Sequence, residues 1–218
     1  MHKIRVWDLP TRLFHMALAC CFVALVITGN VGGEAMVWHF RLGFAMLALL
    51  LFRFLWGFGG GLWSRWSQLR LSPKALIDYW RSPAVLQAGH NPMGSWSVVI
   101  LLVMLLLQVL SGMVSDDEIS NVGPFVPWVS SSLSAFATHW HTETGKMILL
   151  LLVALHLAAI WFYRRFKKQA LTQAMVWGDQ TLAAPAMASR DDTRTRVLAV
   201  VLALACAAAA VLLWRLAP

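Results

Sequence analysis

Long apolar runs, separated by short polar connections, make up most of the chain. Five of these runs are long enough to cross a bilayer as a helix, which takes about 20 residues. They cover Leu13–Asn30, Val37–Phe58, Ser95–Val114, Thr144–Tyr163 and Val197–Leu213. A membrane-spanning strand would alternate apolar and polar positions, whereas these runs are continuously apolar. The pattern therefore predicts an all-α integral membrane protein.

The connections between the runs predict how the chain is organised. We expect a four-helix bundle over residues 1–168, which hold the first four runs. The more polar residues 169–194 are typical of a surface linker, and an additional transmembrane helix is expected over residues 195–218. A serine followed by proline, a common helix start, precedes Lys74–Arg81, which we expect to form a short helix in the membrane interface.

Composition and charge agree with a membrane protein. With 59% hydrophobic residues and a mean hydropathy of +0.66, the chain lies outside the range of soluble globular domains. The net charge of +8 does not indicate nucleic-acid binding, because the basic residues gather on alternate connections, as the positive-inside rule requires. They are Lys3, Arg5, Arg12, Arg65, Arg70, Lys74, Arg81, Arg164, Arg165, Lys167, Lys168, Arg190, Arg194 and Arg196. This distribution predicts a multi-pass protein of a bacterial inner membrane, with a cytoplasmic N-terminus and a periplasmic C-terminus.

Four histidines near the ends of the apolar runs form two pairs of matching depth. His15 lies near the start of the first run and His156 near the end of the fourth, while His39 opens the second run and His141 opens the fourth. In an up-down bundle each pair would lie level, at opposite membrane faces. His141 and His156 are 15 residues apart, a rise of about 22 Å on roughly one helix face. This geometry predicts two bis-histidine haem sites.

Two further histidines leave alternatives open. His139 lies 17 residues before His156, about 100° from its face, and is an alternative to His141 as the outer ligand. His90 opens the third run and has no level partner once the other four are paired. A contact to quinone or to a haem propionate is one interpretation of His90, and a helix cap or an interfacial role is the other.

Glycines near the predicted ligands indicate room for a flat macrocycle. Gly43 and Gly145 each lie four residues after an outer histidine, and therefore on the same helix face. Gly29 returns to nearly the face of His15 at the outer end of the first run. Close helix packing, which is common in membranes, is the other explanation of these three glycines.

Arginines near the histidines are candidates for pairing with haem propionates. Arg12 precedes His15 by three residues, so we expect it near the inner haem, and Arg41 is the candidate for the outer one. Arg53, near the inner end of the second run, is interpreted instead as reaching toward lipid phosphate. The cysteines Cys20, Cys21 and Cys206 all lie in apolar runs, and no Cys-x-x-Cys-His sequence is present, so covalent haem attachment is excluded.

Several motifs together resemble the prokaryotic cytochrome b561 family, which includes the b-type cytochrome subunits of nickel–iron hydrogenases. They are Val6-Trp7-Asp8-Leu9-Pro10-Thr11-Arg12-Leu13-Phe14-His15, Trp38-His39-Phe40-Arg41-Leu42-Gly43, His90-Asn91-Pro92-Met93-Gly94, Asp116-Asp117-Glu118 with Gly123-Pro124, and Val153-Ala154-Leu155-His156. The resemblance covers roughly Val6 to Gly178. It implies a four-helix bundle with two non-covalent b-haems, held by His15 with His156 and by His39 with His141.

The chain departs from the family pattern in two places. The family usually spaces the two ligands of the fourth helix one residue closer, which would place the outer ligand at Thr142. The longer spacing leaves the choice between His141 and His139 open, or implies a local bulge in the helix. The fifth run also lies outside the usual four-helix core.

These features predict a carrier of electrons across the membrane, between the quinone pool and a periplasmic redox partner such as a c-type cytochrome. Bis-histidine ligation leaves no open iron position, so chemistry at the iron is not expected. The acidic segment Asp116–Glu118 is expected to attract a basic partner. One rival hypothesis is a membrane-anchoring cytochrome b subunit of a hydrogenase or similar dehydrogenase. Another is a haem-free metal or proton transporter, which would need carboxylates mid-membrane. Classification as an enzyme and formation of a homodimer stay open.

Overall fold

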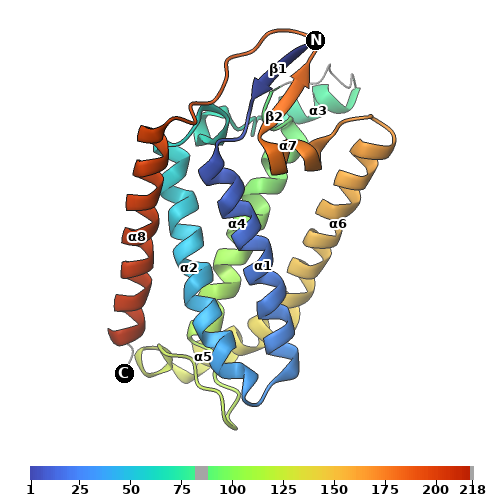
Figure 1. Cartoon of the computed structure of the whole chain (residues 1–218). Coiled ribbons are helices and arrows are strands. Elements are labelled where there is room, and N and C mark those ends of the chain that lie inside the picture. The colour runs from blue at the N-terminus through green and yellow to red at the C-terminus, as the bar shows by residue number, and fades with distance from the viewer. Residues whose placement is uncertain (82–87, 217–218) are drawn as a thin grey trace. The chain divides into compact units, whose positions relative to one another are not determined.

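A computed structural model describes residues 1–81 and 88–216 (Figure 1). Among these residues, five helices are long and apolar enough to cross a membrane. They are α1 (Leu9–Val31), α2 (Ala35–Gly59), α4 (Pro92–Met113), α8 (Thr193–Leu216), and a continuous helical stretch Ser131–Arg165 that contains α5 (Ser131–His139), a π-helix (Trp140–Thr144) and α6 (Gly145–Arg165). Each predicted run coincides with one of them, so the predicted helical membrane fold is confirmed.

Shorter elements connect the long helices. They are β1 (His2–Arg5), α3 (Pro73–Arg81), α7 (Leu171–Trp177), β2 (Asp179–Leu182), and three 3₁₀ turns at Leu62–Ser64, Trp66–Gln68 and Val126–Trp128. The helix expected over Lys74–Arg81 is present as α3. The residues expected to form a plain linker, 169–194, contain α7 and β2.

The chain divides into two compact units. The first contains Met1–His15, Arg53–Ile100 and Ala154–Leu202, and the second contains Met16–Phe52, Leu101–Val153 and Ala203–Pro218. The first unit therefore holds His15, His90 and His156, and the second holds His39 and His141. Each predicted histidine pair belongs to a single unit.

In the first unit, a two-stranded sheet ties the start of the chain to the segment after α7. Strand β1 pairs antiparallel with β2, from His2 opposite Leu182 to Arg5 opposite Asp179. The backbone N–H groups of Val6 and Trp7 donate to the carbonyl of Gly178, whose φ of 89° ends α7 in a left-handed turn. A small apolar core lies beside the sheet, made of Ile4, Val6, Trp7, Ala88, Ala174 and Leu182.

A buried carboxylate fixes the start of α1. Asp8 is fully buried and caps the helix by accepting a hydrogen bond from the Thr11 N–H at 2.8 Å. Its other partners are the Ser64 hydroxyl at 2.7 Å, the Gly61 N–H at 3.1 Å and the Trp56 indole N–H at 3.2 Å. These donors come from the end of α2 and the turn after it, so Asp8 joins the start of α1, and with it His15, to the end of α2.

The second unit has an apolar core drawn from α1, α2, α4 and α6. Its buried members are Cys21, Phe44, Met46, Leu47, Leu50, Leu105, Val109, Met113 and Leu149. The end of α8 belongs to the same unit, and its Trp214 ring lies 4.9 Å from that of Phe44. The fifth helix therefore packs against α2.

Candidate functional site

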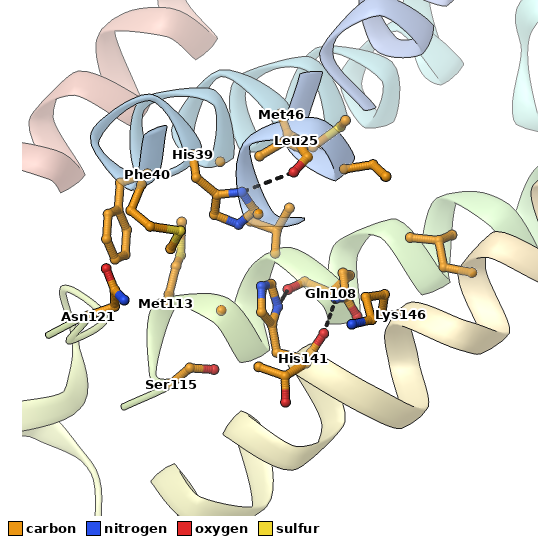
Figure 2. A pocket seen from close by; sticks show the side chains of 18 of the residues that line it. Leu25, His39, Phe40, Met46, Gln108, Met113, Ser115, Asn121, His141 and Lys146 are labelled. Atoms are coloured by element: carbon orange, nitrogen blue, oxygen red, sulfur yellow. Dashed lines mark hydrogen bonds between the residues drawn. The ribbon is translucent and has the colours of Figure 1, made fainter. Parts of the chain in front are cut away.

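A cavity of about 350 Å³ lies in the second unit, with His39 and His141 in its walls (Figure 2). His39 is the fifth residue of α2, and His141 comes from the π-helix. Most of the remaining lining is apolar, as in cofactor sites generally, where a few placed polar groups fix the orientation. The polar lining residues are Asn30, Gln108, Ser115, Asp117, Asn121, Thr138, Thr142 and Lys146.

The two imidazoles face each other across this cavity, as Figure 2 shows. Their ring centroids are 6.0 Å apart and the ring planes are nearly perpendicular, at 82°. A metal–imidazole bond is about 2 Å long, and the ring centroid lies about 1 Å behind the bonded nitrogen. One metal ion bound by two imidazoles on opposite sides therefore separates their centroids by about 6 Å. The separation therefore suits one metal ion bound between the two rings.

Hydrogen bonds orient both rings in the way a metal ligand requires. His39 Nδ1 lies 3.1 Å from the Leu25 carbonyl oxygen, and His141 Nδ1 lies 2.8 Å from that of Gln108. A carbonyl oxygen can only accept, so each Nδ1 carries the proton and each Nε2 keeps its lone pair. Metal-binding histidines show this arrangement, in which the second nitrogen donates to a carbonyl that fixes the tautomer and the ring orientation.

Glycines make space for both rings. A Cβ on Gly29 would lie 3.0 Å from His39 Cε1, and one on Gly112 would lie 2.6 Å from His141 Cε1. Sequence reasoning missed Gly112, although a small residue next to the last position of α4 is the kind of signal that close helix packing leaves. Gly43 lines the cavity, and a Cβ there would meet no atom within 4 Å.

Gly145 has a different role from the one expected. A Cβ there would lie 2.5 Å from Trp140 Nε1 and 2.6 Å from Gln108 Oε1. The space beside Gly145 is therefore filled by these two side chains and is not left for a macrocycle. Gln108 uses that position to donate from Nε2 to the carbonyl oxygen of His141 at 2.7 Å, so it holds the same residue at a second point.

The π-helix at Trp140–Thr144 explains the unusual spacing of the histidines. The Gly145 N–H donates to the Trp140 carbonyl, five residues back, so this turn contains one residue more than an α-helical turn. The extra residue offsets the one-residue increase in spacing and brings His141 to the cavity. His139 is exposed, and its Nε2 lies 3.4 Å from the Thr144 hydroxyl. Of the two candidates, only His141 is brought together with His39.

The cation at this cavity is not the predicted one. Arg41 is exposed and its guanidinium lies 5.0 Å from the centroid of the Trp38 ring. Lys146 lines the cavity instead. It lies five residues after His141, which is more than one turn of an ordinary helix, and the widened turn between them brings both residues to the same cavity.

A second cluster of ionisable side chains lies in the first unit around His90. The pKa of His90 is lowered to about 4, first by burial and then by the nearby charges of Arg53, His15 and His156. The His90 ring also packs 4.7 Å from the Trp7 ring. The structure thus groups His15, His156 and Arg53 around His90.

Several buried nitrogens of this cluster, and one of Arg12 three residues before His15, have no hydrogen-bond partner within the described residues. They are His15 Nδ1, His90 Nδ1, Arg53 Nη1 and Arg12 Nε. Buried donors without partners are rare in proteins, and so many in one place fit a bound group that supplies acceptors. Arg12 also donates from Nη2 to the Val176 carbonyl.

Arg53 does not reach out to lipid as expected. It is only 5% exposed, and its guanidinium lies 4.3 Å from the centroid of the Trp66 ring. The Trp66 ring in turn occupies the space beside Gly57, because a Cβ on that glycine would lie 2.0 Å from Trp66 Nε1. Arg53 is therefore a buried cation beside the histidine cluster.

Comparisons with known proteins match most of the chain to one family. Residues 6–178 match the model of a family described as prokaryotic cytochrome b561. The chain is also 24% identical, over 154 residues, to a protein named "Probable Ni/Fe-hydrogenase 1 B-type cytochrome subunit" from Escherichia coli strain K12, and equally to the protein of the same name from Escherichia coli O157:H7. The match covers 56% of this chain and 64% of each relative, so the chain spans less than two thirds of their length.

Proposed function

The chain belongs to the prokaryotic cytochrome b561 family, and on that basis we propose that it is a di-haem b-type cytochrome that transfers electrons across a bacterial inner membrane. Membership of this family makes the chain a cytochrome b. The five long apolar helices among its described residues make it a multi-pass membrane protein. We propose, beyond this, the number of haems, their ligands, the orientation of the chain in the membrane and its redox partners.

The outer haem is assigned to His39 and His141. The single observation that carries this assignment is the pair of facing imidazoles 6.0 Å apart, each with its Nδ1 proton committed to a backbone carbonyl. Held by His39 and His141, a haem b would supply an iron atom that alternates between two oxidation states. Lys146 is the cation available to a propionate in the same cavity.

The inner haem is assigned to His15 and His156. The unpaired nitrogens of Arg12 and Arg53 are suited to donate to propionate oxygens, which accept strong hydrogen bonds from guanidinium groups. His90 also has a buried nitrogen without a hydrogen-bond partner, but no other histidine remains at its membrane depth. We therefore propose that it contacts a propionate or quinone.

The electron partners are proposed from chemistry and from the relatives. We place the N-terminus in the cytoplasm, because the basic connections follow the positive-inside rule. The acidic segment Asp116–Glu118 then faces the periplasm and would attract a basic c-type cytochrome. The pKa of Asp117 is held below its usual range by the Asn121 N–H and amide and by the N–H groups of Ser120 and Ile119, so its charge persists.

A second candidate function has equal or better support. The two relatives are named as probable B-type cytochrome subunits of a nickel–iron hydrogenase. In this form, the chain would anchor a hydrogenase or similar dehydrogenase in the membrane and pass its electrons to quinone. Both candidates use the same two haem sites and differ only in the periplasmic partner.

Haem counting in the purified full-length chain tests the proposal. We expect a b-type reduced-minus-oxidised spectrum, with two haems per chain by pyridine haemochrome. His141→Ala should lose one haem, whereas His139→Ala, two residues away and exposed, should keep both. A haem-free protein after reconstitution would overturn the electron-transfer function, and retention of both haems in His141→Ala would overturn the ligand assignment. Co-purification with a hydrogenase or with a c-type cytochrome then separates the two candidate functions.

A further inference from the structure

A second, more polar cavity lies where α6 ends and α7 begins. Its volume is about 530 Å³, and all of its lining belongs to the first unit. The lining residues are Arg164, Lys168, Gln169, Ala170, Thr172, Gln173, Val176 and Trp177. None of them is needed to hold a haem in the assignment above.

The charges of this cavity favour an anion. It contains two cations, Arg164 and Lys168, and no acidic residue. Within residues 1–81 and 88–216, neither cation takes part in a salt bridge. Gln169, Thr172 and Gln173 add neutral groups able to donate hydrogen bonds.

The backbone at Lys168 is unusual for a lysine. Its φ of 55° is left-handed, a conformation in which glycine is far more common at the end of a helix. The turn is closed by the Gln169 N–H, which donates to the Tyr163 carbonyl at 3.1 Å. A lysine where glycine would fit at lower cost is consistent with a role for its side chain.

An exposed apolar stripe on α6 leads up to the two cations. Leu157, Trp161 and Arg164 follow one another at spacings of four and three, so they share one face of the helix. Leu157 is 59% exposed and Trp161 is 61% exposed. In a membrane-spanning helix this face contacts acyl chains, and a tryptophan near the basic end is typical of the membrane interface. Trp177, which is 66% exposed, supplies a second such ring beside the cavity.

We propose that this cavity is a binding site for the phosphate head group of an anionic phospholipid, with its acyl chains lying along Leu157 and Trp161. Basic clusters directly after a membrane-spanning helix attract anionic head groups, and the uncompensated charge here selects against zwitterionic lipids. The site does not depend on haem binding, so it stands or falls separately from the proposed function.

Native mass spectrometry of the full-length chain tests the site, with phosphatidylglycerol and phosphatidylcholine titrated in detergent. The variant carries Arg164→Gln and Lys168→Gln, and the matched control carries Arg165→Gln and Lys167→Gln, which remove two neighbouring cations outside the cavity lining. Phosphatidylglycerol should bind the variant roughly 25-fold more weakly, at about fivefold for each lost cation, and should bind the control like the wild type. Circular dichroism and gel filtration check that both variants are folded.

Three results would overturn the proposal. Equal affinity for phosphatidylcholine and phosphatidylglycerol would show that the cavity does not recognise the charge of the head group. Equal loss in the control would show diffuse surface electrostatics in place of a site. Displacement of phosphatidylglycerol by dilute inorganic phosphate would assign the cavity to free phosphate and not to a lipid.

Discussion

At the scale of single residues, the outer histidines show how a backbone carbonyl can orient an imidazole ring. His39 and His141 differ in helix and in local geometry, yet each places Nδ1 against a carbonyl, of Leu25 and of Gln108 respectively. Gln108 belongs to α4, a helix from which no ligand is expected. Its backbone and side chain both contact His141, so α4 takes part in the site by positioning the proposed ligand.

Enlarging Gly112 should disturb the outer site selectively. In Gly112→Ala, the new Cβ would lie 2.6 Å from His141 Cε1, so the ring must shift, at a typical overpacking cost of about 1–3 kcal/mol. We expect a lower content of the outer haem, with the inner haem retained, in the purified variant. Gly59→Ala is the control, because a Cβ there meets only Leu198 at an ordinary 3.8 Å. A full haem complement in Gly112→Ala would show that His141 is not held where the structure places it.

At the scale of elements, the π-helix compensates for the 15-residue spacing of His141 and His156, which is one residue longer than the family pattern. A turn with one additional residue turns the helix face by about 100°, which is the difference between the side of His141 and that of its neighbour. The Thr142 hydroxyl donates to the Thr138 carbonyl. Thr142, at which a family-like spacing would place the ligand, thus bonds to its own helix.

Deleting Thr142 tests whether the widened turn compensates for the longer spacing. The deletion should restore an ordinary α-helical turn and leave His141 facing His39, so the purified protein should keep both haems. Inserting one alanine between Leu149 and Leu150 should instead rotate His141 by about 100° and remove the outer haem. Loss of that haem on deletion, together with its retention on insertion, would contradict the compensation.

At the scale of the whole molecule, ion pairs join segments that lie far apart in the sequence. Arg5 contacts Asp179 at 2.7 Å and Asp191 at 3.1 Å, and Asp191 also contacts Arg196 of α8 at 3.1 Å. The Leu9 N–H at the start of α1 donates to the same Asp191 carboxylate. One carboxylate therefore links the beginnings of α1 and α8 with β1.

This link should weaken in acid. Burial acts to raise the pKa of Asp191, but the hydrogen bonds from Arg196 and Leu9 and the charges of Arg196 and Arg5 outweigh it, so the folded pKa is lowered. Because the folded pKa lies below the unfolded value of about 3.9, the stabilisation is present above that pH and is lost as the pH falls below it.

Hydrogen exchange measures this effect. Amides of residues 2–9 should lose protection between pH 5 and pH 3 by more than the intrinsic pH dependence of exchange. Asp191→Asn should show low protection at both pH values, since it lacks the titrating group. An unchanged acid step in Asp191→Asn would assign the transition to another carboxylate.

Much of the fold followed from the sequence because bilayer thickness is a strict physical constraint. Only a helix or a closed barrel satisfies every backbone hydrogen bond in hydrocarbon, so a continuous apolar run of sufficient length predicts its own structure. The matched depths of the four ligand candidates follow from the same runs and from the regular rise of a helix. The family resemblance, confirmed over residues 6–178, also rests on local motifs that can be read directly.

Contacts between distant segments were decided only by the tertiary structure. Neither the pairing of His2–Arg5 with Asp179–Leu182 nor the Gly112 contact with His141 leaves a local pattern, because both depend on residues far apart in the chain. The positions of Arg53 and Arg41 differ from the sequence interpretation, since a long cationic side chain can point outward or toward the interior from the same backbone position. Sequence alone thus determined the spans and the depths of the histidines. Packing determined which of His139 and His141 meets His39, because a single extra residue in one turn changes the direction of a side chain without changing the apolar pattern around it.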